Sequence, residues 1–140
     1  MQPKLSVAEV GNFLIRQFPQ MAGEFEVVSV GPMTARIRMT PEARHLRPGG
    51  TVSGPTIFAL ADCAVYLCLM AMIGPEALAV TTNASIDFMR KSLPGQPLEA
   101  EVRLLKLGRA LAVGDVLVVS DGADGPVARA TLTYSIPPKR

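Results

Sequence analysis

One apolar run constrains the fold of this chain more than any other feature. The seventeen residues from Ile57 to Ile73, IFALADCAVYLCLMAMI, contain a single charge, Asp62, and are followed by Gly74-Pro75. This length is at the lower limit for a bilayer span, and a charge in lipid is costly without a partner. The segments on both sides alternate like the strands of a soluble domain. We therefore expect a buried helix that begins near Ser53-Gly54-Pro55.

Composition and charge exclude several classes of protein. The chain has 140 residues, of which 49% are apolar and 19% charged, as in one folded domain. Fourteen basic and twelve acidic residues give a net charge of +2, which is too balanced for a nucleic-acid groove or an anionic-membrane anchor. We expect a single domain over 1–140, with a helical lead-in over 1–24 and the core over 25–136.

The other segments predict one more helix and a set of antiparallel strands. Ser6 and Glu9 form a capping-box pattern for a helix over about 6–18, which Pro19 ends. Strands are expected over 25–30 and 33–39, and then over 78–90, 98–107, 111–119 and 127–136, with a loop over 41–50. This order predicts an α+β fold, in which an antiparallel sheet surrounds the apolar helix.

The cysteines and the histidine give no metal or disulfide pattern. Cys63 and Cys68 are five residues apart in the apolar helix, about 140° around its axis, and cannot easily bridge. Free buried thiols suit the cytoplasm, and the first residues lack the apolar core of a signal peptide. The single histidine, His45, lies in the loop before the helix, where it is either a proton carrier or a solvated side chain.

Asp62 is the sharpest chemical signal. A carboxylate held among apolar residues is a candidate general base or nucleophile, because such a site changes how the acid holds its proton. The structural alternative is an Asp that pairs with an arginine or caps a loop. At the helix start, Ser53 is a plausible N-cap, and the Gly54 amide, at the positive end of the helix dipole, could bind an oxyanion.

The same residues resemble a known family. The sheet around one apolar helix resembles the hotdog fold, and residues 47–55 with Asp62 resemble the PaaI-like (phenylacetate-type) hotdog thioesterases, whose motif is N-x-x-G-x-x-H-G-G with an acid nine residues after the His. The resemblance continues through residues 85–90 and 107–109 and covers about 25–136. Three positions depart from the motif: Arg47 replaces the Asn, Ser53 the His and Pro55 the second Gly.

This resemblance implies an acyl-CoA thioesterase that uses Asp62 as base or nucleophile and the Gly54 N–H as oxyanion donor. It also implies that Thr81 supplies a hydroxyl that orients the attacking water, although Thr in a strand is more often only a β-former. No metal or cofactor is expected, because coenzyme A is part of the substrate. The candidate substrate-binding residues, several of them basic groups for the coenzyme A phosphates, are Arg47, Ser53, Pro55, Phe58, Thr82, Arg90, Lys91 and Arg109.

Spacing predicts that two chains share one site. Gly54 and Asp62 are eight residues apart on one helix, which separates them by about 12 Å along the axis, too far for one carbonyl to contact both. We therefore expect a homodimer, possibly a dimer of dimers, with sites between subunits, as the resemblance also implies. Two other functions stay open: an acyl-CoA-binding protein without activity, because Arg47 and Ser53 replace motif residues, and last a hydratase, which lacks its usual histidine here.

Overall fold

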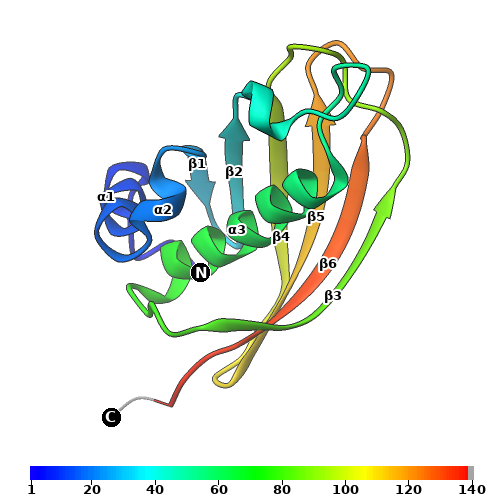
Figure 1. Ribbon diagram of the computed structural model, residues 1–140. Helices are drawn as coiled ribbons and strands as arrows, with labels where there is room; N and C mark the ends of the chain where they lie inside the picture. Colours follow the sequence, from blue (N-terminus) through cyan, green and yellow to red (C-terminus); the bar gives the residue numbers. More distant parts are fainter. Residues whose placement is uncertain (139–140) are drawn as a thin grey trace.

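The computed structural model, which describes residues 1–138, is built on a six-stranded antiparallel sheet that curves around one long helix, α3 (Gly54–Ile73) (Figure 1). The strand order across the sheet is β1-β2-β4-β5-β6-β3. The strands are β1 Glu26–Gly31, β2 Thr34–Met39, β3 Val80–Phe88, β4 Leu98–Leu107, β5 Leu111–Ser120 and β6 Ala128–Ser135. This arrangement confirms the predicted α+β hotdog fold, and the strand bounds agree with the predicted ranges to within two residues.

The apolar run forms the core helix, as predicted. α3 is long and apolar enough to cross a membrane, but 72% of its most apolar 18-residue window is buried inside the domain. β5 approaches this helix so closely that a Cβ on Gly114 would lie 2.8 Å from a methyl of Val65. Glycine at position 114 therefore sets how near the sheet can come to the helix.

β4 shows why the sheet covers the helix with only one face. Its inward residues Leu98, Ala100, Val102 and Leu104 are buried, whereas the residues between them point toward water. On the outer face, Arg36 of β2 forms ion pairs with Glu99 and Glu101. The predicted alternation is therefore confirmed, with one face of the sheet packed on the helix and the other turned to water.

The N-terminal lead-in contains two helices rather than one. α1 (Val7–Gln17) has the predicted capping box, in which Ser6 Oγ accepts from the Glu9 amide and the Glu9 carboxylate accepts from the Ser6 amide. Pro19 does not only end this helix but also begins the short helix α2 (Pro19–Ala22), because proline is well tolerated in a first helical turn. Both helices lie beside β1 and α3, and Phe13 of α1 is fully buried in the core (Figure 1).

The two edges of the sheet differ. β1 is six residues long and carries a bulge after Val27. β3 is nine residues long and exposed along most of its length, with Val80 56% exposed and Phe88 53% exposed. An edge strand of this kind presents unpaired backbone groups to a partner strand.

Candidate functional site

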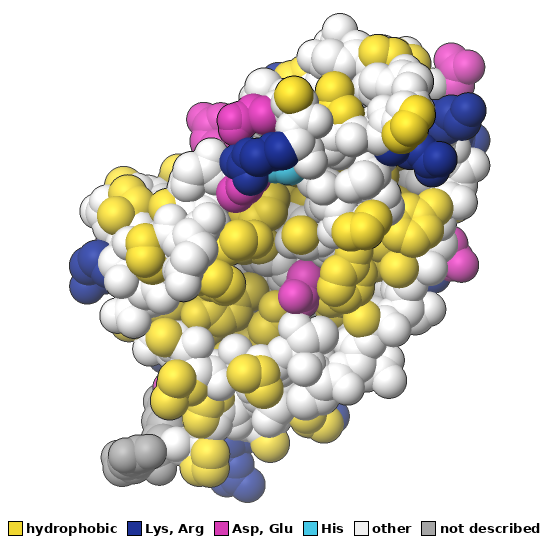
Figure 2. Space-filling model, in the orientation of Figure 1, with side chains coloured by type: hydrophobic (Ala, Val, Ile, Leu, Met, Phe, Trp, Pro, Cys, Tyr) yellow, Lys and Arg dark blue, Asp and Glu magenta, His cyan; other side chains and the backbone are white. Residues whose placement is uncertain are grey.

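Asp62 lies in an open groove rather than inside the core. Its side chain is half-buried, and the groove, of about 540 Å³, is lined by the α1–α2 junction, α3, the start of β3 and one residue of β6. We call this cavity the Asp62 groove. Phe18, Phe58 and Tyr66 give it apolar walls, and of the residues 1–138 that the structure describes, Asp62 is the only charged one that lines it. Figure 2 shows that this face of the molecule is hollowed and largely apolar.

Two hydroxyl groups hold one oxygen of Asp62. Thr81 Oγ1 donates a hydrogen bond to Asp62 Oδ1 at 2.6 Å, and Tyr134 Oη donates to the same oxygen at 2.7 Å. Thr81 of β3 and Tyr134 of β6 are cross-strand partners, so their side chains leave the same face of the sheet side by side. The pairing shifts by one residue at Thr82, directly after Thr81, and this bulge is where the strand can redirect a side chain.

Other titratable groups of the groove stay uncharged at neutral pH. Burial, together with the nearby Asp62, raises the pKa of the Cys63 thiol to about 12, so this thiol is not a ready nucleophile. Burial and the negative charge of Asp62 also raise the pKa of Tyr134, which keeps its hydroxyl protonated as a donor. Cys63 and Tyr134 therefore act in the groove as neutral groups, and among the described residues Asp62 is the one carboxyl group that lines it.

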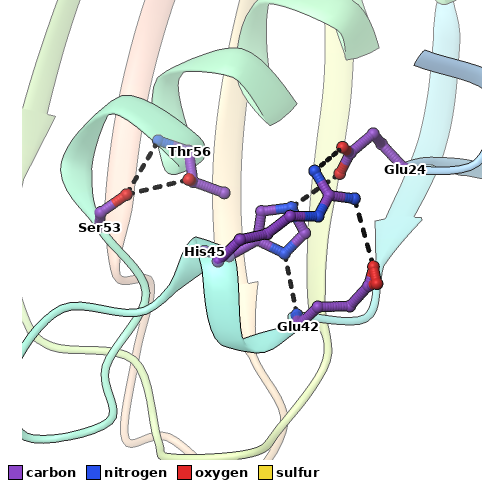
Figure 3. A network of polar contacts seen from close by, with 6 residues as sticks. Glu24, Glu42, His45, Ser53 and Thr56 are labelled. Atoms are coloured by element: carbon purple, nitrogen blue, oxygen red, sulfur yellow. Dashed lines mark hydrogen bonds and ion pairs between the residues drawn. The ribbon is translucent and has the colours of Figure 1, made fainter. Parts of the chain in front are cut away.

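The start of α3 provides a different kind of site. Ser53 is the N-cap, as predicted: its Oγ lies 3.4 Å from the Thr56 amide nitrogen and 2.9 Å from Thr56 Oγ1 (Figure 3). Pro55 occupies the first turn and has no N–H. Within residues 1–138, no acceptor takes the N–H of Gly54, and the Phe88 ring lies against this glycine, 3.5 Å from where a Cβ would be. The amide is thus available to an anionic oxygen.

Three of the predicted basic residues gather near Gly54. Arg47, Arg90 and Lys91 line a second cavity of about 400 Å³ with Gly54 and Phe88, which we call the Gly54 cavity. Arg90 also donates a hydrogen bond to the carbonyl of Pro126 at 2.6 Å, and this contact ties Arg90 to the loop before β6. All three are exposed side chains, as expected for groups that stay hydrated until a ligand binds.

Arg109 lies at the other end of the sheet. It lies in the turn between β4 and β5, just before Leu111, and Leu111 pairs through Ser135 of β6 with the Val80 end of β3. Phe88 and the Gly54 cavity lie at the opposite end of the sheet, where Val118 pairs with Ala128. Figure 1 shows the two ends well apart. Within one chain, Arg109 therefore does not meet Arg90 or Lys91 on one small ligand.

His45 is buried and hydrogen-bonded, so the expectation of a solvated side chain is wrong. It is 7% exposed and ends a short 3₁₀ helix, η1 (Ala43–His45), inside the predicted loop (Figure 3). Its Nδ1 accepts the Glu42 amide at 2.8 Å, so its Nε2 carries the proton and donates to Glu24 at 2.7 Å. Burial would raise the pKa of Glu24, but hydrogen bonds from Arg44 and His45 outweigh it and lower that pKa. This network, with His45 and Glu24 on its covered side, holds the loop that leads to Arg47.

The structure therefore divides the predicted site residues into two groups. Asp62, Thr81 and Phe58 line the Asp62 groove, and Gly54, Arg47, Arg90 and Lys91 line the Gly54 cavity. Pro55 lines a smaller cavity beside His45, and Thr82 is exposed on the edge strand and lines neither of the two larger cavities. Within residues 1–138, Asp62 pairs with no arginine, which was one of the two structural alternatives for it, because both hydrogen bonds to its carboxylate come from hydroxyl groups.

Sequence reasoning missed Tyr134, whose hydroxyl contacts Asp62 directly. The only available signal was that a tyrosine at an inward position of a strand needs a polar partner for its hydroxyl. Among the described residues, no group of three or more His, Cys, Asp or Glu side chains is arranged to hold a metal ion.

Comparison with known proteins identifies the family. The model of the thioesterase superfamily matches residues 49–126, more than half of the chain, whereas no curated protein sequence matches. A candidate thioesterase from a Silicibacter species has 53% sequence identity and a TM-score of 0.92, covering 99% of this chain and 96% of its own.

Two further solved structures are more distant. A variant of the phenylacetic acid degradation protein PaaI from Thermus thermophilus is 32% identical, with a TM-score of 0.73, over 85% of this chain and 99% of its own. A Streptococcus mutans protein solved with acetyl-CoA is 28% identical, with a TM-score of 0.72, over 84% of this chain and 91% of its own. With its sheet wrapped around α3 and its matching residues 49–126, the chain belongs to the thioesterase superfamily, as a PaaI-like hotdog-fold member.

Proposed function

We propose that the protein is an acyl-CoA thioesterase in which Asp62 activates water or attacks the thioester, and the Gly54 N–H of a partner subunit stabilises the oxyanion. The observation that carries this proposal is the carboxylate of Asp62, which projects into an apolar groove with Oδ1 held by Thr81 and Tyr134. Within the described residues, no protein donor takes Oδ2, so this oxygen can accept a proton from water.

The reaction can be written with the residues present. In the general-base route, Asp62 Oδ2 takes a proton from water while the water oxygen bonds to the thioester carbonyl carbon. The carbonyl oxygen becomes an oxyanion at the Gly54 N–H, where the dipole of α3 favours negative charge. The C–S bond then breaks, and the coenzyme A sulfur leaves with the proton that Asp62 took up. Coenzyme A enters as part of the substrate, and no other cofactor or metal takes part in these steps.

The need for two subunits follows from α3. Gly54 and Asp62 lie on the same continuous helix, so eight residues of helical rise separate them by about 12 Å. One thioester carbonyl cannot contact both within one chain, whereas two chains facing each other in opposite directions can bring Gly54 of one toward Asp62 of the other.

The exposed edge of β3 suggests how the subunits pair. Thr81, at the start of this strand, contacts Asp62, and Phe88, at its end, covers Gly54. If two β3 strands pair antiparallel about a point near Ala84, residue 88 of one subunit lies opposite residue 80 of the other. The Gly54 cavity of one subunit then adjoins the Asp62 groove of its partner, and the dimer has two such sites. A dimer of dimers is compatible with this pairing.

The same pairing gathers the predicted phosphate-binding residues. Arg109 lies at the Val80 end of its own sheet, two strands from β3, about 10 Å across the sheet. Arg47, Arg90 and Lys91 of the partner lie at the Phe88 end, which the pairing brings to Val80. We therefore assign these four residues to the phosphates of one coenzyme A, with the acyl group in the Asp62 groove between Phe58 and Thr81. We place the enzyme in the cytoplasm, where Cys63 and Cys68 stay reduced.

One specific observation favours an alternative. Arg47 and Ser53 replace the Asn and His of the family motif, so a protein that binds acyl-CoA without hydrolysing it is the second candidate. The two functions are separated by turnover of a panel of acyl-CoAs, with release of free thiol as the signal and Asp62→Asn as the control. Hydrolysis by the wild type that Asp62→Asn loses supports the enzyme, whereas binding of acyl-CoA with no thiol release at any pH contradicts it and supports the alternative.

A further inference from the structure

We infer that Tyr134 is a positioning residue for the reaction: its hydroxyl, together with that of Thr81, holds Asp62 Oδ1 so that Oδ2 is turned to the groove. This inference rests on the proposed function for its kinetic consequences. The juxtaposition of the two hydroxyls on one oxygen does not depend on that function, because both bonds are present in the folded chain.

Tyr134 is buried and packs against another aromatic ring. The residue is 3% exposed, and its ring lies 6.0 Å from the ring of Tyr66. Tyr66 is itself held by a hydrogen bond to the Ala77 carbonyl and by the ring of Phe13 at 5.9 Å. A rigid aromatic column therefore extends from α1 to Asp62, and the Tyr134 hydroxyl has little freedom to move away from the carboxylate. Such a donor is ready before substrate binds.

The two carboxylate oxygens of Asp62 differ in their hydrogen bonds. Tyr134 Oη lies 2.7 Å from Oδ1 and 3.0 Å from the backbone carbonyl of Asp62, so it can donate to either but lies closer to the carboxylate. Thr81 donates to the same Oδ1 at 2.6 Å. Because both donors lie on one side, rotation of the carboxylate would break two hydrogen bonds at once. Oδ2 is left as the oxygen that can accept a proton from water.

Within one subunit, the hydroxyls of Thr81 and Tyr134 are the hydrogen-bond donors to the Asp62 carboxylate among the described residues. The titratable groups that line the groove around Asp62 are Cys63 and Tyr66 from α3 and Tyr134 from β6, all uncharged at neutral pH. The α1–α2 junction contributes neutral Gln17 and Gln20, and β3 contributes Thr81. In the proposed dimer, Arg47, Arg90 and Lys91 of the partner would face the same site, and they are unchanged by a substitution at Tyr134.

The test is Tyr134→Phe, which keeps the ring and removes only the hydroxyl. A hydrogen bond to a charged group supports roughly a tenfold effect, so we expect kcat to fall about tenfold while KM changes by less than about twofold. Asp62 Oδ1 also loses one of its two hydroxyl donors, so the acidic limb of the kcat/KM profile should move to higher pH. Thr81→Val should move the limb in the same direction.

Tyr66→Phe is the matched control, because it removes a hydroxyl from the neighbouring ring that bonds to Ala77 and not to Asp62. Its acidic limb should coincide with that of the wild type. The inference is overturned if Tyr134→Phe leaves both kcat and the acidic limb of the kcat/KM profile unchanged. It is also overturned if kcat falls while the acidic limb does not shift, because that result would mean a purely structural role. A shift of equal size in Tyr66→Phe overturns it as well.

A readout without turnover separates this inference from the proposed function. The carboxyl carbon-13 resonance of Asp62, identified by its absence in Asp62→Asn, can be followed as a function of pH in wild type and Tyr134→Phe. A titration that moves to higher pH in Tyr134→Phe supports the inference even if no acyl-CoA is hydrolysed, in which case only the proposed function fails. Coincident titrations in the two proteins overturn it.

Discussion

The Gly54 cavity and the Asp62 groove differ in the kind of group that each offers to a substrate. At the start of α3, the group we propose to bind the oxyanion is the backbone N–H of Gly54, and the surrounding Gly54 cavity is basic. Eight residues later, the proposed base or nucleophile is the side chain of Asp62, and the Asp62 groove is apolar with two neutral hydroxyl donors. All three departures from the family motif, Arg47, Ser53 and Pro55, fall around the helix start, and none falls in the groove.

The two ends should therefore tolerate substitution to different degrees. A backbone N–H survives substitution of its neighbours as long as the helix begins at the same residue, and Ser53 still caps α3 here. A carboxylate has no such substitute, because its position depends on side chains from β3 and β6. We therefore expect the groove to be far more sensitive to single substitutions than the helix start.

The largest expected effect comes from Asp62→Asn. The amide keeps the size of the side chain but cannot take a proton from water or attack the thioester as a carboxylate does, so kcat should fall at least roughly a hundredfold. Thiol release from acyl-CoA measures the effect, with circular dichroism as the control for folding. Turnover near the wild-type rate in a folded variant would remove Asp62 from the mechanism.

A mixed dimer tests whether the two ends meet across subunits. Gly54→Val places a branched side chain against Phe88, where a carbonyl would approach, and it should inactivate its own homodimer as Asp62→Asn inactivates the other. After equal amounts are unfolded and refolded together, half of the dimers are mixed, and each of these has one site without either substitution. Random pairing therefore restores about a quarter of the wild-type activity.

This experiment has clear controls. Circular dichroism and gel filtration must show that Gly54→Val folds and pairs, and native mass spectrometry must show that subunits have exchanged. If both conditions are met and the mixture stays inactive, Gly54 and Asp62 do not act on one thioester from different chains.

A smaller effect distinguishes the basic residues at the two ends of the sheet. Lys91→Ala and Arg109→Ala should each raise KM for acyl-CoA by roughly threefold to tenfold with little change in kcat, because each removes one charge-assisted contact to a phosphate. Steady-state kinetics at constant ionic strength measure this effect, and Lys106→Ala, near Arg109 but outside both cavities, is the matched control. An increase for only one of the two variants would contradict a shared coenzyme A site.

The smallest effect is expected from Ser53→His, which restores the motif histidine. Activity toward aryl- and acyl-CoAs should rise or stay unchanged, since the Gly54 N–H is kept, while loss of the Ser53 cap should lower the free energy of unfolding by about 1 kcal/mol. Thiol release and thermal unfolding measure the two quantities, and Ser53→Ala separates loss of the cap from gain of the imidazole. A large loss of activity in a folded Ser53→His variant would give Ser53 a specific role.

The elements that depend on a local pattern could be predicted from the sequence. The apolar run with its single acid defined α3 as a core helix, the alternation in residues 98–107 defined β4, and the Ser6 capping box defined the start of α1. These features depend on neighbours within a few positions, where periodicity and capping chemistry act. Spacing on one helix was also enough to predict that Gly54 and Asp62 are separated within a chain.

The side chains that contact Asp62 from distant parts of the sequence became known only from the tertiary structure. Tyr134 is 72 positions from Asp62 along the chain, and the contact exists because β6 pairs with β3 in the register that sets Tyr134 beside Thr81. Sheet order likewise separated Arg109 from Arg90, and packing of η1 against Glu24 buried His45. Strand register and loop packing arise from the sum of many long-range contacts, and no local pattern in the sequence encodes them.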